Sequence, residues 1–268
     1  MKKIITLLLA ACMVFALCAC GSTAASAPAA QEAEETYVFK QGFDLDYPPY
    51  SYLSDDGSVG GFDVEVCKAV CDYLGWGYEA VPFNWDAKDA ELQAGSCDCI
   101  WSGFTVEGRE DDYCWSEPYS VNSQMILVAD DSGIKTLDDL AGKVVGVQTA
   151  TSAYTMLTED RTELTDSFAD LKVYETYPIA FQDLKAGGID AIAVDATLGS
   201  FLISDETGYS FLDESLGDET YAIGFRIGDD ALRDQVNDAL KALWADGTIA
   251  KILENDDYTE IADYISLS

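Results

Sequence analysis

The chain has 268 residues, 49% of them apolar and 12% aromatic, which is enough for one large packed domain or two smaller lobes. Its 15 lysines and arginines against 49 acids give a net charge of −34, a field that repels phosphate backbones and argues against nucleic acid as a partner. The sequence contains no histidine, which excludes a histidine general base, a Ser-His-Asp triad and every zinc site that uses imidazole.

The N-terminus predicts a secretory signal peptide. Lys2 and Lys3 precede an apolar run over residues 4–17, and a run of this length is too short to span a bilayer comfortably. We assign residues 1–19 to the signal peptide, and its removal makes the remaining chain more acidic by two charges.

Two cysteines follow this run, and Cys20 is the better candidate for a lipid anchor. The sequence Leu-Cys-Ala-Cys resembles the lipobox of bacterial lipoproteins, in which cleavage precedes the cysteine that receives the lipid. Small Ala19 precedes Cys20, whereas bulky Leu17 precedes Cys18. The next residues are mostly Ala, Ser, Glu and Gln, which cannot bury enough surface to fold, so residues 20–36 should form a flexible tether.

The first half of the chain alternates strands and helices. Asp44, Tyr47 and two prolines form a stiff loop after the first strand, with an acid and an aromatic ring at its mouth. Apolar residues that recur at intervals of three and four predict a helix that Asp63 caps and Gly75 ends. The other expected segments are a strand over 38–43, a strand over 78–83, a helix over 87–93 and a strand over 98–101.

The stretch after that last strand, up to Arg109, predicts an anion clamp, because ligands of α/β proteins bind at the carboxyl ends of strands. Thr105 offers a hydroxyl group, the glycines expose backbone N–H groups, and Arg109 carries a planar fork of donors that matches a carboxylate. The alternative is that Arg109 only pairs with one of the acids that follow it, which are Glu110, Asp111 and Asp112.

An internal repeat indicates two lobes of like construction. Residues 92–100 read LQAGSCDCI and residues 184–192 read LKAGGIDAI, identical at five of nine positions. Upstream of these, Tyr78, Glu79 and Pro82 match Tyr174, Glu175 and Pro178. Each copy is a strand, a helix, a glycine and a strand. The alternative is coincidence between two generic α/β junctions.

If the lobes are alike, the residues after Ile192 occupy the place that Trp101 to Thr105 take in the first lobe. Asp195 would then face Arg109 across a common cleft. An α-amino acid carries one carboxylate and one ammonium group at a fixed separation. An arginine on one lobe and an aspartate on the other therefore suit an α-amino acid.

The second lobe should begin near Gln124. A helix that opens within residues 148–153 would present free N–H groups to a second oxygen of an anion. Residues 254–268 receive no assignment. The other expected segments are a capped helical turn at 136–140, a strand at 144–147, a strand at 222–227 that returns to the first lobe, and an amphipathic helix at 231–245 that Gly247 ends.

Five cysteines remain in the folded part, and their odd count does not form a disulfide framework. Two of them lie one helical turn apart, which is poor disulfide geometry. We expect buried thiols that behave as small hydrophobic side chains, with thiolate metal binding as the alternative. The five are Cys67, Cys71, Cys97, Cys99 and Cys114.

Several motifs occur in a fixed order: GGFDVEV (60–66), the arginine after GFT, WSEPY (115–119), AGKVVGVQTATSA (141–153), IDAIAVD (189–195) and LRDQVNDALKALWADGTIAKI (232–252). Together they resemble the family 3 solute-binding proteins of amino-acid ABC importers, over about residues 39–253. The resemblance implies an α/β chain with the type II periplasmic-binding-protein fold, in which two α/β lobes joined by two crossing strands close on a ligand in the cleft between them. Lobe 1 would comprise 37–123 plus 222–268, and lobe 2 would comprise 124–221.

The resemblance also implies which residues bind the ligand backbone. Arg109 and Thr105 would hold the α-carboxylate, helped by Ser152 at a helix N-terminus and by the neighbouring Thr151. Asp195 would take the α-ammonium group.

The Ser102 or Gly103 carbonyl would assist Asp195, and three other residues would surround the ligand side chain. Tyr47 and Trp85 match positions whose rings sandwich it, and Asp44 lies near its far end.

Three departures from the family pattern bear on specificity. The spacing from Gly103 to Arg109 is one residue shorter than in better-known members, Ala150 replaces a glycine, and Val194 replaces a histidine that contacts glutamine in glutamine binders. Asp44 lies near the rings of Tyr47 and Trp85, and the chain as a whole is strongly negative. We therefore expect a polar or cationic L-amino acid of the arginine/lysine, glutamine or cystine class. Glutamate and aspartate should not bind.

The implied function is capture of an amino acid outside the cell and delivery to ABC permease and ATPase subunits. The protein would be a lipid-anchored monomer on the outer face of the bacterial cell membrane, with no catalytic residue, cofactor or metal. Two other functions stay open, since fold alone does not set function. One is an enzyme similar to the periplasmic cyclohexadienyl dehydratases, and the other is a sensory domain that acts through a partner.

Overall fold

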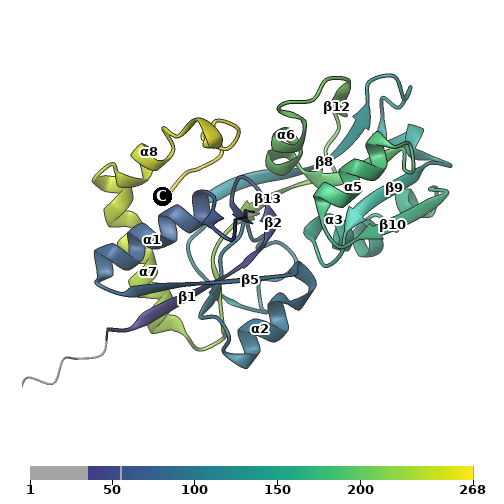
Figure 1. The fold of residues 1–268 in the computed structure, drawn as a ribbon. Coiled ribbons are helices and arrows are strands. Elements are labelled where there is room, and N and C mark those ends of the chain that lie inside the picture. The colour runs from purple at the N-terminus through teal and green to yellow at the C-terminus, as the bar shows by residue number, and fades with distance from the viewer. Residues whose placement is uncertain (1–35, 55, 268) are drawn as a thin grey trace, which may run out of the picture. The chain divides into compact units, whose positions relative to one another are not determined.

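The computed structural model describes residues 36–54 and 56–267. The predicted signal peptide, the lipid anchor at Cys20 and residues 20–35 of the predicted tether lie outside the described residues. The described chain builds two main β-sheets with helices packed against them, which confirms the predicted mixed α/β class (Figure 1). We call the part around the five-stranded sheet the first lobe and the part around the six-stranded sheet the second lobe.

The sheet of the first lobe has the strand order β5-β1-β6-β14-β7. Strand β1 runs parallel to both neighbours, and β14 runs antiparallel to β6 and β7. A small antiparallel sheet, β2-β3-β4, follows β1 in the chain. The bounds are β1 Val38–Asp44, β2 Asp46–Tyr47, β3 Ser51–Leu53, β4 Val59–Gly60, β5 Gly77–Phe83, β6 Cys99–Ile100, β7 Cys114–Trp115 and β14 Gly224–Phe225.

Helices cover both faces of this sheet, with α1 on one side of β1 and β5 and α2 on the other (Figure 1). Each face has its own apolar cluster: Phe39 of β1 packs with α1, whereas Ile100 of β6 packs with Leu92 of α2. The helices are α1 Phe62–Leu74, α2 Lys88–Ala94, α7 Asp230–Ala245 and α8 Thr248–Ile252, with 3-10 turns Trp85–Ala87 and Asp256–Tyr258.

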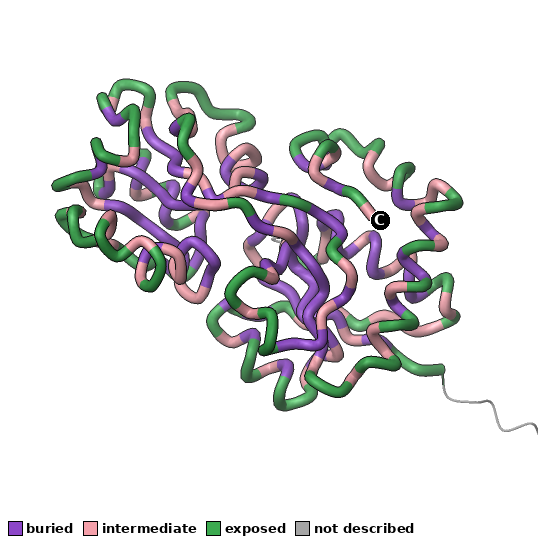
Figure 2. The backbone as a smooth tube through the Cα atoms, turned by 180° about the vertical axis from the view of Figure 1, so that it is seen from behind, coloured by how far each residue is buried: buried purple, intermediate pink, exposed green. Residues whose placement is uncertain are grey.

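The sheet of the second lobe has the order β10-β9-β11-β8-β12, and β13 also pairs with β8. Strand β9 is parallel to its neighbours, whereas β8 is antiparallel to all of its own. The strands are β8 Ser120–Ala129, β9 Val144–Gln148, β10 Asp170–Tyr174, β11 Ala191–Asp195, β12 Tyr209–Phe211 and β13 Gly217–Tyr221. The helices are α3 Ser152–Thr155, α4 Thr162–Thr165, α5 Tyr177–Lys185 and α6 Ala196–Ile203, with a 3-10 turn Leu137–Leu140 and a π-helical turn Met156–Asp160. The central strands of both sheets are buried, and the exposed backbone lies mainly in the connections (Figure 2).

The internal repeat is real in its downstream half only. In both lobes the first strand of the repeated unit lies between its second and third strands, as β5-β1-β6 and as β10-β9-β11. Residues 92–100 and 184–192 both lead from the end of a helix into the third strand, as predicted. The upstream match is wrong, because Pro82 lies within β5 whereas Pro178 lies within α5.

Two antiparallel segments, β8 and β13, carry the chain between the two sheets. The predicted returning strand at 222–227 is misplaced: β13 ends at Tyr221, and β14 already belongs to the first sheet. The hydrophobic pattern missed β13 because one of its two buried positions is an acid, Glu219.

Asp63 does not cap α1, contrary to the prediction. The helix begins at Phe62, and the cap position is Gly61, where a Cβ atom would lie 2.3 Å from the Tyr50 carbonyl oxygen. Asp63 is instead buried in the first turn, and its Oδ2 accepts hydrogen bonds from Gly103 N (2.7 Å) and the Tyr119 hydroxyl (2.7 Å). Asp63 therefore holds the loop that follows β6.

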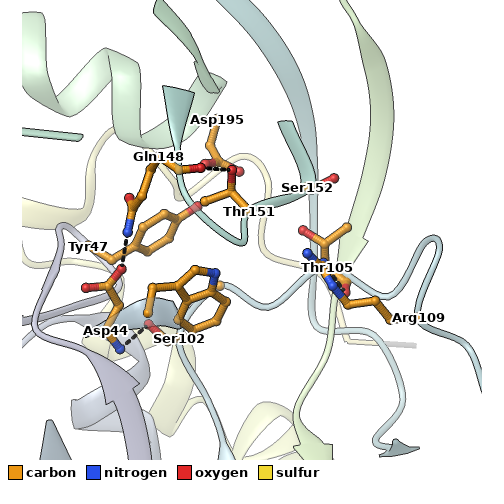
Figure 3. A pocket seen from close by; sticks show the side chains of 11 residues that line it. Asp44, Tyr47, Ser102, Thr105, Arg109, Gln148, Thr151, Ser152 and Asp195 are labelled. Carbon is orange, nitrogen blue, oxygen red and sulfur yellow. Dashed lines mark hydrogen bonds between the residues drawn. The ribbon is translucent and has the colours of Figure 1, made fainter. Parts of the chain in front are cut away.

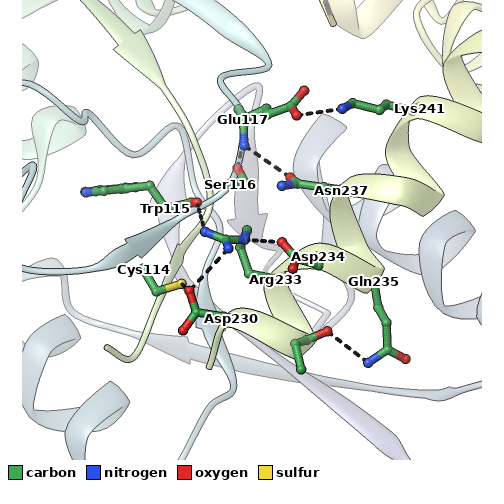
Figure 4. Close-up of polar contacts among 11 residues, drawn as sticks. Cys114, Trp115, Ser116, Glu117, Asp230, Arg233, Asp234, Gln235, Asn237 and Lys241 are labelled. Carbon is green, nitrogen blue, oxygen red and sulfur yellow. Dashed lines mark hydrogen bonds and ion pairs between the residues drawn. The ribbon is translucent and has the colours of Figure 1, made fainter. Parts of the chain in front are cut away.

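The predicted amphipathic helix at 231–245 is confirmed as α7, and its polar face holds the segment that leads into β8 (Figure 4). Arg233 Nη1 donates to the Trp115 carbonyl oxygen at 3.2 Å. Asn237 Oδ1 accepts from Glu117 N at 3.1 Å, and Lys241 pairs with the Glu117 carboxylate at 2.5 Å.

The C-terminal residues, which the sequence left unassigned, pack against the first lobe. Tyr258 and Ile261 are buried in its core. Val121 N donates to the Tyr264 carbonyl oxygen at 3.0 Å, and Ile265 forms an isolated bridge with Ser120. The tail thus pairs with the first residues of β8.

All five cysteines of the described chain are buried and free. Burial raises the pKa of Cys97 to about 12, so its thiol stays protonated at neutral pH. Within residues 36–54 and 56–267, no three His, Cys, Asp or Glu side chains are grouped as metal ligands would be. None of the helices in the same ranges is long and apolar enough to cross a membrane.

Candidate functional site

A small cavity is lined by residues of both lobes (Figure 3). Its walls are the carboxyl ends of equivalent strands, as expected for an α/β protein. Asp44 ends β1 and Gln148 ends β9, while Ser102 follows β6 and Asp195 ends β11. The structure brings all ten predicted ligand-binding residues to this cavity: Asp44, Tyr47, Trp85, Ser102, Gly103, Thr105, Arg109, Thr151, Ser152 and Asp195.

Arg109 reaches the cavity without an acidic partner. Its Nη1 donates to the Thr105 carbonyl oxygen (3.2 Å), and its guanidinium lies over the Phe104 ring, 5.4 Å from the centroid. Among the residues that the structure describes, no carboxylate lies within 4.0 Å of Arg109, so the alternative pairing with a following acid is wrong. A guanidinium has five N–H donors, and backbone carbonyls occupy only part of them here.

Ala150 holds an unusual backbone conformation next to Arg109. Its φ is 57°, the left-handed region, where an L-residue costs about 1–2 kcal/mol and glycine costs little. The Ala150 carbonyl oxygen accepts from Trp85 Nε1 at 3.1 Å and from Arg109 Nη2 at 3.4 Å. The strained loop of the second lobe therefore orients two cavity residues of the first lobe.

Tyr47 and Trp85 supply two aromatic walls. The Tyr47 hydroxyl is 2.9 Å from the Tyr221 hydroxyl, and Trp85 packs edge-on against Phe104. Gly103 has a φ of 52°, and a Cβ atom there would lie 2.6 Å from the Tyr47 ring. Only glycine leaves room for the Tyr47 ring at this place.

Asp44 both caps its own loop and faces the cavity. Its Oδ1 accepts from Asp46 N (3.0 Å), and its Oδ2 accepts from Gln148 Nε2 (2.9 Å) across the cavity. Burial raises the pKa of Asp44 to about 6. The sequence analysis did not assign Gln148, although a glutamine that ends a buried run of valines is a usable signal.

Asp195 lies in a cluster of buried polar side chains. Its Oδ1 accepts from the Tyr221 hydroxyl (2.7 Å), Gln124 Nε2 (2.6 Å) and Asn122 Nδ2 (3.1 Å). Glu219 accepts from the same two amides. Glu219, Asn122 and Gln124 carried no prediction from the sequence, because alternate polar residues on a strand usually face solvent.

The hydroxyl groups predicted to meet the ligand are partly engaged by the protein. Thr105 Oγ1 donates to Glu219 Oε2 at 3.1 Å, and Ser102 Oγ is 2.7 Å from Ser51 Oγ. Thr151 is the N-cap of α3: its Oγ1 accepts from Tyr154 N at 3.2 Å.

Ser152 is the first residue of α3, is 6% exposed and lines the cavity. Polar contacts also join the lobes beside the cavity, since Asn84 Nδ2 donates to Glu175 Oε1 at 2.7 Å.

Comparisons with known proteins agree with this geometry. The sequence profile of the bacterial extracellular solute-binding proteins, family 3, matches residues 39–255. The L-cystine-binding protein of Escherichia coli (strain K12) is 31% identical over 217 residues, which are 80% of this chain and 80% of that protein. The arginine-binding extracellular protein of Bacillus subtilis (strain 168) is 31% identical over 266 residues, 94% of this chain and 96% of that protein.

A solved structure is similar as well. The substrate-binding protein of an ABC uptake transporter from Streptococcus pneumoniae, crystallised with bound histidine, is 30% identical and superposes with a TM-score of 0.78, covering 81% of this chain and 91% of that one. The two-lobed architecture with a ligand cleft is therefore confirmed as a periplasmic-binding-protein fold. The chain belongs to the bacterial extracellular solute-binding proteins, family 3.

Proposed function

We propose that the protein is the substrate-binding component of an ABC importer and captures a polar or cationic L-amino acid of the arginine/lysine, glutamine or cystine class. The lobes would close on the ligand and deliver it to permease and ATPase subunits. The protein would act by binding and not by catalysis, so its ligand should be recovered unchanged.

One observation carries the proposal: a single cavity contains a guanidinium and a carboxylate, neither of which has a charged partner of opposite sign among the described residues. Arg109 donates to backbone carbonyls, and Asp195 accepts from amides and a phenol. A buried charge without a counter-charge is costly unless a ligand supplies one. The carboxylate of an α-amino acid would pair with Arg109 and its ammonium group with Asp195.

The far end of the cavity supports a polar or cationic side chain. Asp44 and Gln148 lie at the side of the cavity away from Arg109 (Figure 3). Tyr47 and Trp85 would flank the ligand side chain, and a cation beside aromatic rings gains about 0.5–2 kcal/mol. Asp44 is a good partner for a guanidinium or ammonium group and a poor one for a carboxylate.

The family is extracellular, and we infer the finer location from the N-terminal sequence. Removal of residues 1–19 would expose Cys20 for lipidation, and residues 20–36 would tether the folded lobes to the outer face of the bacterial cell membrane. Within the lobes, we infer that residues 124–221 form the mobile unit that closes on 37–123 plus 222–268. We infer a monomer, with no nucleic-acid partner.

The test is a thermal-shift panel on the purified protein with L-arginine, L-lysine, L-histidine, L-glutamine, L-cystine and L-glutamate. A ligand at 100 times its dissociation constant adds about 2.7 kcal/mol to the stability of the folded protein, which is easily detected. Agmatine, which is arginine without its carboxylate, should give no shift, because it leaves Arg109 unpaired. L-Glutamate should give none either.

The expected outcome is a shift with at least one neutral or cationic amino acid. No shift with any α-amino acid would contradict the proposed function, and a shift with glutamate alone would contradict the assigned ligand class. Small-angle scattering with and without the selected ligand then tests closure, since a ligand that contacts both lobes favours the closed state.

A further inference from the structure

The ammonium end of the cavity contains a second acid, Glu219, to which the proposed function gives no role. Glu219 is 3% exposed and Asp195 is 4% exposed. Asp195 Oδ1 and Glu219 Oε1 lie beside each other, because each accepts from the same two amide nitrogens at distances of 2.6 to 3.1 Å. No lysine or arginine nitrogen of the described chain lies within 4.0 Å of either one. Two anions at this separation in a buried site would repel each other strongly.

Two neutral amides are shared between the acids. Asn122 Nδ2 donates to Asp195 Oδ1 (3.1 Å) and to Glu219 Oε1 (2.6 Å). Gln124 Nε2 donates to the same two oxygens at 2.6 and 2.8 Å. Gln124 keeps this orientation although its Oε1 is buried without a partner, because the reversed amide would point oxygen at two acids. The pair therefore needs more donors than the side chains supply.

A proton between the acids supplies the missing donor. We propose that Glu219 holds a proton in the empty protein and donates it to Asp195, and that it releases this proton to solvent when the ligand's ammonium group binds at Asp195. The inference rests on the proposed function, because it requires an ammonium group at Asp195. Glu219 is a positioning residue: it sets the charge of the acid that meets the ligand.

The surrounding groups agree with a proton on this pair at neutral pH. Burial and the Asp195 charge both raise the pKa of Glu219. Three phenols also face Glu219, and burial raises the pKa of each well above its usual range, so they stay neutral: Tyr47 of β2, Tyr177 of α5 and Tyr221 of β13. The Thr105 and Ser152 hydroxyls do not titrate.

Two other ionisable groups of the cavity, Arg109 and Asp44, take no part in the proposed proton release. Arg109 donates to the carbonyl oxygens of Thr105 and Ala150. Asp44 titrates in a lower range, at about pH 6. A proton released above pH 7 therefore does not come from Asp44.

The charge balance predicts how affinity depends on pH. The ammonium group enters as a cation, one proton leaves the Glu219 carboxyl group, and no bond of the ligand changes. Because a cation stabilises the Glu219 anion, the ligand lowers the pKa of Glu219, and by linkage the affinity rises with pH while protons are released. The limit is tenfold in affinity per pH unit for one whole proton.

The test is calorimetric titration of the full protein with the amino acid that gives the largest shift in the panel above, at pH 7.0 and 8.0, in phosphate and in Tris. These buffers differ in ionisation enthalpy, so a difference in binding heat counts the protons released. The expected result is release of a fraction of one proton by the wild type and none by Glu219→Gln. The matched control is Glu107→Gln, which changes an exposed glutamate that accepts from Thr220 and should behave as the wild type.

Equal proton release by the wild type and Glu219→Gln, or none by the wild type, would overturn the inference. The wild-type titration decides on its own should Glu219→Gln not fold. If no amino acid binds, the proposed function fails, and the proton on Glu219 is then tested on the empty protein. Unfolding free energy should fall more steeply from pH 6.5 to 8.5 in the wild type than in Glu219→Gln, and parallel curves would overturn the assignment.

Discussion

The two lobes use one strand order for opposite chemistry. Strand β6 of the first lobe leads into a glycine loop and a cation, Arg109, whereas the equivalent strand β11 of the second lobe ends in an acid, Asp195. The ends of the first strands also differ, with Asp44 facing Gln148. Even the left-handed residues beside the cavity differ, since the first lobe has Gly103 and the second has Ala150. A repeated scaffold fixes where side chains emerge, and the residue types there decide what each half binds.

The largest effect should follow removal of the cation. Arg109→Ala leaves the ligand carboxylate buried without a partner, which costs about 4 kcal/mol, or close to a thousandfold in affinity. Arg109→Lys should fail nearly as badly, because an ammonium group cannot copy the planar fork. Calorimetry on both variants measures this. A loss of less than tenfold in Arg109→Ala would contradict the assignment of the carboxylate site.

Removal of the acid of the second lobe should affect binding and stability in opposite directions. Asp195→Asn loses the partner of the ammonium group, at a cost of about 3 kcal/mol in binding. The empty protein should become more stable by about 1 kcal/mol, because Asp195 carries the one buried negative charge of the pair and the substitution removes it. Calorimetry and urea unfolding give the two numbers. Lower stability with intact binding would rule out this account of the pair.

Asp44, at the end of β1, should control which ligand side chain the cavity accepts. Asp44→Asn removes the negative charge opposite Gln148 and should weaken an arginine or lysine ligand about tenfold, with a smaller effect on glutamine. Affinities for arginine, glutamine, cystine and glutamate, with and without the substitution, test it. Equal weakening of all four ligands would mean that Asp44 acts through the fold alone.

Stability should fall as pH rises from 5 to 8, because two buried acids of the first lobe have raised pKa values. Burial raises the pKa of Asp44 to about 6 and that of Asp63 to about 7, above the usual value of about 4. The folded state then binds protons that the unfolded state has already lost. The resulting stability is complete below about pH 4 and is lost as pH passes through 6 and 7.

Urea unfolding across this range measures the slope, and Asp44→Asn should flatten its part near pH 6. Repulsion between surface acids also grows with pH, but salt screens it, whereas buried groups are screened much less. A slope that disappears in 0.5 M salt would assign the effect to the surface instead.

The smallest effect concerns the left-handed residues. Ala150→Gly relieves a strained φ of 57° but makes the unfolded chain more flexible, so the net gain should be below about 1 kcal/mol. Gly103→Ala is the opposite case, since its Cβ would collide with the Tyr47 ring. Thermal unfolding of both variants compares them, and a loss of stability in Ala150→Gly would show that the alanine methyl group contributes packing that outweighs the strain.

The sequence predicted those cavity residues that lie at the ends of apolar strands. Asp195 ends a buried strand and the loop that carries Arg109 follows another, so the strand ends and the internal repeat predicted that these two residues share a cleft. The place of Asp44 near the ligand side chain came from the resemblance to the family. The internal repeat predicted two lobes of like construction. Its upstream half was wrong, because the residues that it matched lie in different elements.

The missed residues share one physical reason. Glu219, Asn122 and Gln124 alternate with other residues on β8 and β13, and such a pattern normally predicts a solvent-exposed face. Only the pairing of the two strands places their polar sides together in the interior. Asp63 misled in the same way, because an acid before an apolar helix resembles a cap until its partners from other segments are known.

The pairing of the tail with β8 has a genetic consequence. A late stop codon that removes the residues after Asp257 deletes no residue that lines the cavity. It does delete the buried Tyr258 and Ile261 and the bonds from Tyr264 and Ser266 to the start of the crossing strand. Such an allele should therefore appear as an absence of protein from the cell, and not as a transporter with altered substrate preference. The acidic C-terminus is part of the fold, and its loss would be scored as a null mutation.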